Sequence, residues 1–205
     1  MNHVDRLVRE ARDAAAYGRA YADHLGTLLA RLDVEAIGRL ADLLVDARAA
    51  GQMVYLAGNG GSAACASHWA TDLLNGTFVT GTPPLRAMSL VENVALLTAI
   101  ANDQSYDRVL TGQLEKLLAP RDVLIIISAS GNSPNVVDAA KYAKTRGAST
   151  VGVLGFNGGR LKDLCDLVIM VPTPPGEYGP VEDVHLVISH ILTTWLKARF
   201  EADGR

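Results

Sequence analysis

Two short loops rich in small polar residues are the first features of this sequence that could do chemistry. One loop, Gly58-Asn59-Gly60-Gly61-Ser62, follows the apolar residues 53–57. Glycines let a backbone approach a ligand closely, and the Ser62 hydroxyl can add a hydrogen bond. The pattern is neither GxGxxG nor a P-loop, which argues against dinucleotides and nucleoside triphosphates. A tight turn that needs glycine only for its backbone angles remains the alternative.

The second loop, Ser128-Ala129-Ser130-Gly131-Asn132-Ser133-Pro134-Asn135, carries a more specific signal. Pro134 suits the first position of a helix, and Ser133 suits its N-cap. The hydroxyls of Ser128, Ser130 and Ser133 would then gather at a helix N-terminus, where free amides and the helix dipole favour an anion. Capping alone would account for Ser133 but not for the other two serines. The loop therefore predicts a phosphate site without a lysine.

Histidines and carboxylates form two further groups. His68 and Asp72 lie four residues apart on the helix expected after the first loop, hence on one face. They could share a divalent cation, or the carboxylate could orient the imidazole; a plain surface pair is the alternative. Near the C-terminus, a polar cluster interrupts an apolar helical run: Glu182, Asp183, His185 and His190. A single histidine there would be a core group, but two histidines with carboxylates favour a functional role.

The spacing of Glu182 and His190 restricts how they could act together. On one straight helix, eight residues separate them by about 12 Å in rise and about 80° in direction. Such side chains cannot readily meet at one metal ion. Either the helix starts after Glu182, or the two residues come from different subunits. We favour a site shared across subunits.

Hydrophobic patterning predicts the elements that hold these residues. Continuous apolar runs at 53–57, 123–127, 151–154 and 167–171 are typical of parallel strands covered on both faces, and 86–90 is a fifth candidate strand. Helices are expected near 62–75, 92–101, 105–118, 134–147 and 159–165, with a last one at about 181–200. Residues 4–49 predict two helices, with Asp33 as the N-cap of the second and Gly51 as its stop. We expect one α/β domain over residues 1–205, with N-terminal helices in 1–50 and the sandwich in 51–205.

The overall composition excludes several classes of function. The formal net charge is −3 and no block of lysine and arginine stands out, so nucleic acid is not expected as a partner. The two cysteines, Cys65 and Cys165, have no redox or zinc spacing and predict free, buried thiols in a reducing compartment. The N-terminus lacks the pattern of a signal peptide, and no apolar run is long enough for a membrane helix. A cytoplasmic protein without a membrane partner is expected.

The two loops, each after a predicted strand, resemble those of the SIS (sugar isomerase) domain, and essentially the whole chain is similar to the phosphoheptose isomerases. The resemblance implies a flavodoxin-like parallel sheet sandwiched by helices, a homotetramer with active sites at subunit interfaces, and isomerisation of sedoheptulose 7-phosphate through a cis-enediol. It implies Asp72 and His190 as the catalytic pair, and a zinc ion held by His68, Asp72, Glu182 and His190. The implied contacts to substrate and phosphate are Asn59, Gly60, Gly61, Ser62, Asp103, Ser128, Ser130, Ser133 and Glu182.

The chain departs from this family at several of these positions. The family typically has glutamate where Asp72 stands and glutamine where Glu182 stands, commonly threonine at Ala129, and often an arginine near 75–78. The shorter Asp72 must reach further, and Glu182 adds a negative charge. These departures leave room for a longer, octulose-type sugar phosphate. A second alternative is a non-catalytic SIS tetramer that regulates replication initiation, although the presence of His190 favours an enzyme. Asp103 could equally be part of a helix-ending turn.

Overall fold

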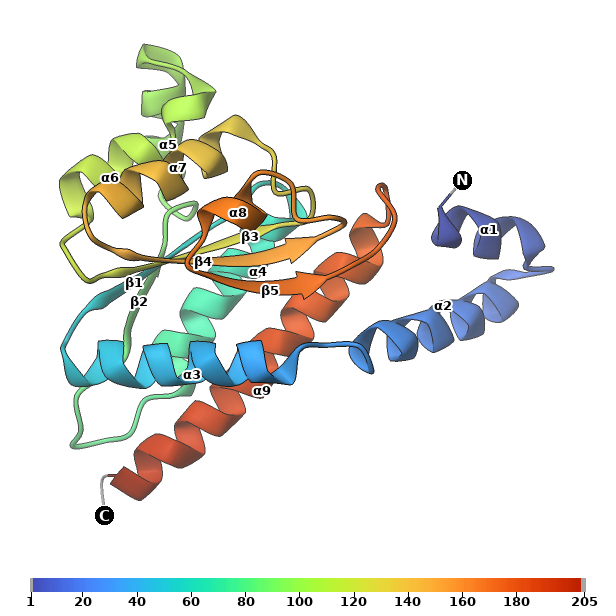
Figure 1. The fold of residues 1–205 in the computed structure, drawn as a ribbon, viewed down its shortest axis with the longest axis horizontal. Coiled ribbons are helices and arrows are strands. Elements are labelled where there is room, and N and C mark those ends of the chain that lie inside the picture. The colour runs from blue at the N-terminus through green and yellow to red at the C-terminus, as the bar shows by residue number, and fades with distance from the viewer. Residues whose placement is uncertain (1, 204–205) are drawn as a thin grey trace.

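One sheet of five parallel strands forms the centre of the protein (Figure 1). The computed structural model describes residues 2–203. The strands are β1 (Met53–Ala57), β2 (Arg86–Ser89), β3 (Val123–Ser128), β4 (Ser149–Gly155) and β5 (Leu167–Val171). Each lies within a residue or two of a predicted apolar run. All six residues of β3 are buried, as expected for a strand covered on both faces.

The strand order is β2-β1-β3-β4-β5, which is the flavodoxin-like arrangement. Val54 of β1 pairs with Val123 of β3, and Leu124 of β3 pairs with Thr150 of β4. After β1, the chain adds β2 on one side of it and then β3, β4 and β5 on the other side. At such a switch point the loops leaving neighbouring strands run to opposite faces and open a crevice beyond their carboxyl ends. The glycine loop follows β1 and the serine loop follows β3, so both open at this crevice.

Helices cover both faces of the sheet (Figure 1). One face packs on α3 (Val34–Ala49), α4 (Gly61–Thr71) and α9 (Tyr178–Asp203). The other packs on α5 (Val94–Asp103), α6 (Thr111–Leu117), α7 (Pro134–Thr145) and α8 (Leu161–Leu164). Alternate residues of β3 serve the two cores: Ile125 and Ile127 join the first, and Leu124 and Ile126 the second. The predicted fold class is confirmed.

The N-terminal segment differs from the prediction, because it forms three helices rather than two. These are α1 (His3–Glu10), α2 (Ala14–Leu29) and α3. The break before α2 is made by Asp13, whose Oδ1 accepts a hydrogen bond from the Ala16 amide at 2.7 Å. No glycine or proline marks this break in the sequence. As predicted, Asp33 caps α3 and Gly51 follows its end with a φ of +67°.

Four other predictions need correction. The helix expected at 62–75 is α4 followed by a π-helical turn, η1 (Asp72–Gly76), and the helix expected at 105–118 is a 3-10 turn, η2 (Tyr106–Arg108), followed by α6. Helix α9 begins at Tyr178, three residues before the predicted start, and therefore includes Glu182. Cys165 is half-buried, whereas Cys65 is buried as predicted. No helix within residues 2–203 is long and apolar enough to cross a bilayer.

The buried histidine of α9 links stability to pH. His185 is fully buried, neither ring nitrogen has a hydrogen-bond partner among residues 2–203, and burial lowers its pKa to about 4. The folded state therefore keeps His185 neutral, whereas the unfolded chain binds a proton below about pH 6.5. Stability is present above that pH and is lost as the pH falls towards 4. Between about pH 8 and pH 5, we expect this residue to lower the free energy of unfolding by about 2 kcal/mol.

Urea unfolding of the wild type and of His185→Leu at both pH values measures this contribution. Leucine fills a similar volume without a titrating group. On acidification, the free energy of unfolding should therefore fall by about 2 kcal/mol less in the variant than in the wild type. The same loss in both proteins would contradict the assignment to His185.

Candidate active site

A small hollow lies at the carboxyl ends of β1 and β3, at the switch point of the sheet. Its volume is about 140 Å³, and it gathers the four predicted serines from two loops that are far apart in sequence. The lining residues are Asn59, Ser62, Ser128, Ala129, Ser130, Ser133, Tyr178 and Glu182. Of these, Tyr178 had no local sequence signal, because it reaches the hollow only through the packing of α9.

The serine loop leaves one hydroxyl unused. Ser128 Oγ accepts a hydrogen bond from the Gly131 amide at 3.0 Å, and Ser130 Oγ accepts one from the Asn132 amide at 3.4 Å. Ser133 occupies the predicted N-cap of α7, with proline next to it, but its side chain makes no capping hydrogen bond. Capping was therefore the wrong role for this hydroxyl. It faces the hollow beside the N-terminus of a twelve-residue helix, where an anion is favoured.

Asn59 mainly ties the two loops together. Its amide exchanges two hydrogen bonds with the amide of the buried Asn135, each 2.9 Å long. Its Oδ1 also accepts a hydrogen bond from Tyr106 Oη at 2.9 Å. The Oδ1 atom of Asn59 therefore already accepts two hydrogen bonds, and the residue holds the glycine loop against the start of α7. Asn135 and Tyr106 were missed as site residues, because their partner lies far away in the sequence.

Glu182 forms the wall between two hollows. Its carboxylate lies against Gly61, where a Cβ would overlap it, so any larger residue at 61 would displace the Glu182 side chain. Glu182 lines the serine hollow and also a second hollow of about 350 Å³, which reaches His68. Burial raises the pKa of Glu182, and the neighbouring Asp183 raises it further. Gly60, the other predicted glycine, is the N-cap of α4 with a φ of +55°.

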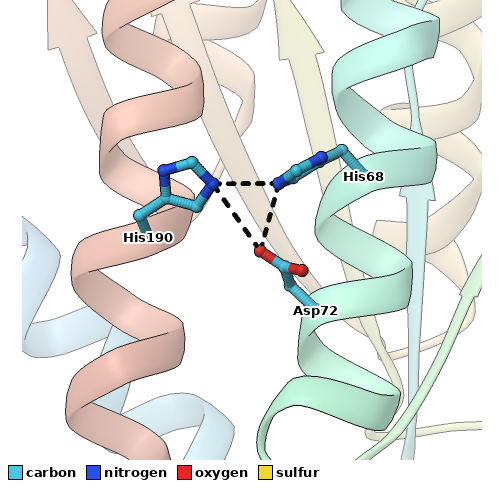
Figure 2. Close-up of side chains that lie close together, drawn as sticks. All are labelled: His68, Asp72 and His190. Carbon is cyan, nitrogen blue, oxygen red and sulfur yellow. Dashed lines mark hydrogen bonds and ion pairs between the residues drawn. The ribbon is translucent and has the colours of Figure 1, made fainter.

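Three side chains from α4, η1 and α9 converge as Figure 2 shows. His68 Nε2 lies 3.0 Å from His190 Nε2 and 3.1 Å from Asp72 Oδ2, and His190 Nε2 lies 3.9 Å from Asp72 Oδ2. In tetrahedral zinc sites, ligand atoms lie about 3.3 Å apart, because metal–ligand bonds are about 2.0 to 2.1 Å. The three atoms can therefore hold one divalent metal ion. The two histidines are half-exposed, which leaves that position open to a substrate.

All three members of this group come from one chain, so Asp72 and His190 meet without a second subunit. The expected sharing between subunits concerned Glu182 and His190, and it stays a prediction. Asp72 is the first residue of η1, where the helix changes its hydrogen-bond pattern, as often occurs at functional sites. Glu182 is not brought to the group by this chain, since it lies two turns before His190 on the same helix.

Asp103 also lies apart from the hollow. It is the exposed last residue of α5, and its Oδ1 accepts a hydrogen bond only from the adjacent Asn102 side chain, at 3.0 Å, among the interactions of residues 2–203. In this chain it forms a helix end, as the alternative interpretation held. Tyr106, three residues further on, is the part of this segment that reaches the site.

Comparison with known proteins agrees with this geometry. The sequence model of the SIS domain matches residues 17–155, which places the fold and the crevice in the SIS class. A phosphoheptose isomerase of Solidesulfovibrio magneticus is 39% identical over 189 residues, covering 92% of this chain and 85% of that protein. One of Bradyrhizobium sp. is 35% identical over 204 residues, covering 98% of each. The structure of a phosphoheptose isomerase from Francisella tularensis superposes with a TM-score of 0.80 at 26% identity, covering 97% of this chain and all of that one.

The chain therefore belongs to the phosphoheptose isomerase family. This confirms the family that the two loops indicated, and with it the prediction of an enzyme that isomerises a sugar phosphate.

Glu182 provides a direct test of the hollow as an anion site. Its carboxylate shares about 140 Å³ with the serine hydroxyls, so its charge should oppose phosphate. We expect Glu182→Gln to bind inorganic phosphate about three- to tenfold more tightly near pH 8, as measured by calorimetric titration. The advantage should shrink as the pH falls through the raised pKa of Glu182, because the wild-type carboxyl then becomes neutral.

Glu92→Gln makes the same charge change away from the hollow and serves as the control. Equal phosphate affinity in wild type and Glu182→Gln at every pH would contradict an anion site in this hollow.

Proposed function

We propose that this protein interconverts sedoheptulose 7-phosphate and the corresponding aldose 7-phosphate through a cis-enediol. One observation carries the proposal: a phosphate-sized, serine-lined hollow lies at the start of α4, and a His–Asp–His group lies near the end of the same helix, with α9 contributing to both. The family of relatives supports the same activity.

The distance between the two features suits an extended sugar. Ser62 and His68 are six residues apart on α4, which corresponds to about 9 Å along the helix. The second hollow, on the far side of Glu182, connects them. A sugar phosphate anchored at the serines would lie along this path and bring its C1 and C2 atoms to the histidines.

The phosphate would be held by hydroxyls, amides and the N-terminus of α7. Within the described chain, no lysine or arginine lines the hollow. The hydroxyls of Ser62, Ser128, Ser130 and Ser133 can donate hydrogen bonds, and the helix dipole adds a partial positive charge. Because the phosphate does not react, its binding energy serves to hold the reacting carbons in place.

Asp72 and His190 would carry the proton transfers. One removes a proton from C1 of the ketose while the carbonyl oxygen at C2 is protonated, which gives the cis-enediol. A proton is then delivered to C2 and another leaves the C1 hydroxyl, so that an aldehyde forms and the atoms balance. Both groups are partly exposed and can reach a substrate that enters beside α9.

We further propose zinc as the metal of this group, held by His68, Asp72 and His190. The facing Nε2 atoms and their separations support this assignment. A bound zinc ion would act as a Lewis acid towards the carbonyl and its neighbouring hydroxyl. Glu182, the fourth predicted ligand, stays a prediction and would require a rearrangement or a second subunit. Neither an octulose-type substrate nor a regulatory tetramer is favoured by the relatives.

An exposed apolar patch beside this group supports the proposed homotetramer with active sites at subunit interfaces. Ile191 and Trp195 are 45% and 48% exposed on one face of α9, and Leu74 and Phe78 are each 45% exposed in and just after η1. Helix α9 packs against η1 and Ile191 directly follows His190, whereas Leu74 lines a separate hollow beside β2. Exposed large apolar groups commonly mark an interface. A single domain over 1–205 and a cytoplasmic location also remain our proposals.

Proton NMR in D2O tests the activity. With sedoheptulose 7-phosphate as substrate, we expect aldose signals to appear with deuterium at C2. His190→Gln and Asp72→Asn should each slow this conversion by at least about 100-fold, as expected for loss of a general acid or base. Glu10→Gln, on the distant α1, is the control and should keep full activity. Absence of both aldose and exchange in the zinc-loaded wild type would refute the proposed reaction.

Metal analysis tests the zinc site independently of activity. Purified wild type dialysed against zinc should retain about one ion per chain, and His68→Ala should lose about 10-fold or more in zinc affinity. His24→Ala removes a histidine far from the group and should bind zinc as the wild type does. Equal zinc retention by His68→Ala and His24→Ala would rule out this group as the binding site.

A further inference from the structure

We infer that Glu177 is a positioning residue, through which the N-terminal helices hold the first turn of α9 and set the affinity of the phosphate hollow. The inference rests on the proposed function, because it concerns how that same hollow is kept in shape. It assigns a role to α1 and α2, which lie beside the sandwich and reach back to the start of α9 (Figure 1).

Glu177 is a buried acid fully engaged with the N-terminal helices. Its side chain is 0% exposed, its Oε1 accepts a hydrogen bond from the His3 amide at 2.6 Å, and its Oε2 lies 3.0 Å from His24 Nε2. The His24 side chain is itself only 11% exposed and packs on the His3 ring, with centroids 4.3 Å apart. A buried carboxylate is stable only when paired, so both partners are required for Glu177 to stay in place.

A second contact joins the same two parts of the chain. Tyr21 Oη of α2 donates a hydrogen bond to Asp183 Oδ2 of α9 at 2.6 Å. The hydroxyl approaches so closely that a Cβ at Gly179 would lie only 3.0 Å from it. The first two turns of α9 are thus held on one side by α1 and α2, at positions 177, 179 and 183.

The other side of the same turns forms the site. Tyr178 and Glu182, which directly neighbour Glu177 and Asp183 in sequence, both line the serine hollow. The Tyr178 ring packs edge-on against Phe156, with centroids 5.1 Å apart. A shift of this turn would therefore move two walls of the hollow. His190 lies further along α9, where α4 and η1 support it, and should not move.

This arrangement predicts a split between the kinetic constants. Glu177→Ala should raise KM for sedoheptulose 7-phosphate about tenfold while kcat stays within about twofold. The reason is that the variant loosens the walls of the phosphate hollow but leaves the His–Asp–His group in place. Glu177→Gln can still accept from the His3 amide and donate to His24 Nε2, and should restore KM to near wild type. Asp23→Ala, next to His24 on α2 without a side-chain contact to α9 among residues 2–203, is the matched control and should not change KM.

Titration with inorganic phosphate separates this inference from the proposed function. We expect Ser133→Ala and Glu177→Ala each to bind phosphate at least about fivefold more weakly than the wild type. Unchanged binding by Ser133→Ala would refute the hollow itself as the phosphate site. Weakened binding by Ser133→Ala together with unchanged binding and KM in Glu177→Ala would refute only the positioning role, as would equal changes in kcat and KM.

Tyr21→Phe keeps the test decisive if Glu177→Ala does not fold. It removes one hydroxyl from the second contact and leaves the buried acid in place. We expect phosphate binding to weaken about two- to threefold with kcat unchanged, and wild-type phosphate affinity in a folded Tyr21→Phe would overturn the inference.

Discussion

The reversal of strand order between β1 and β3 is the constraint on which the rest of the site depends. Parallel strands place their carboxyl ends at one edge, and the reversal sends the following helices to opposite faces of the sheet. A crevice then opens between two helix N-termini that would otherwise be covered. The fully buried β3 pairs with β1 and β4 in a fixed register, and so fixes how far apart the glycine and serine loops stand.

Helix α9 turns this crevice into an enclosed site. It crosses the face that α4 also covers, and the absence of a side chain at Gly61 lets the Glu182 carboxylate rest directly on the start of α4. Close approach at this end brings His190 opposite His68 two turns further on. Helices α4 and α9, together with η1, therefore supply a wall of the phosphate hollow and all three members of the metal-binding group.

Charge is arranged unusually along this path. The anion end has no lysine or arginine in its lining and includes a carboxyl group whose pKa burial raises. Hydroxyls and the dipole of α7 must outweigh that carboxyl for phosphate to bind there. The histidines and Asp72 at the other end stay open to solvent on one side. A phosphate and a metal ion would thus be kept apart by the length of a sugar.

The sequence alone determined most of the strands, because β1, β3, β4 and β5 each contain an apolar run whose burial depends on local composition, whereas β2 has only a weak signal. It also determined the two loops and the placing of His68 and Asp72 on one helical face, since these follow from neighbours within a few residues. Only the tertiary structure decided which distant groups meet. Asn135 and Tyr106 contact Asn59, His190 lies beside His68 of the same chain, and Glu177 pairs with His24. The tertiary structure also placed Asp103 at an exposed helix end that does not line the hollow of this chain, and it divided the N-terminal helices at Asp13. Local patterns report burial and helix ends, whereas contacts between remote segments depend on how whole helices pack on the sheet.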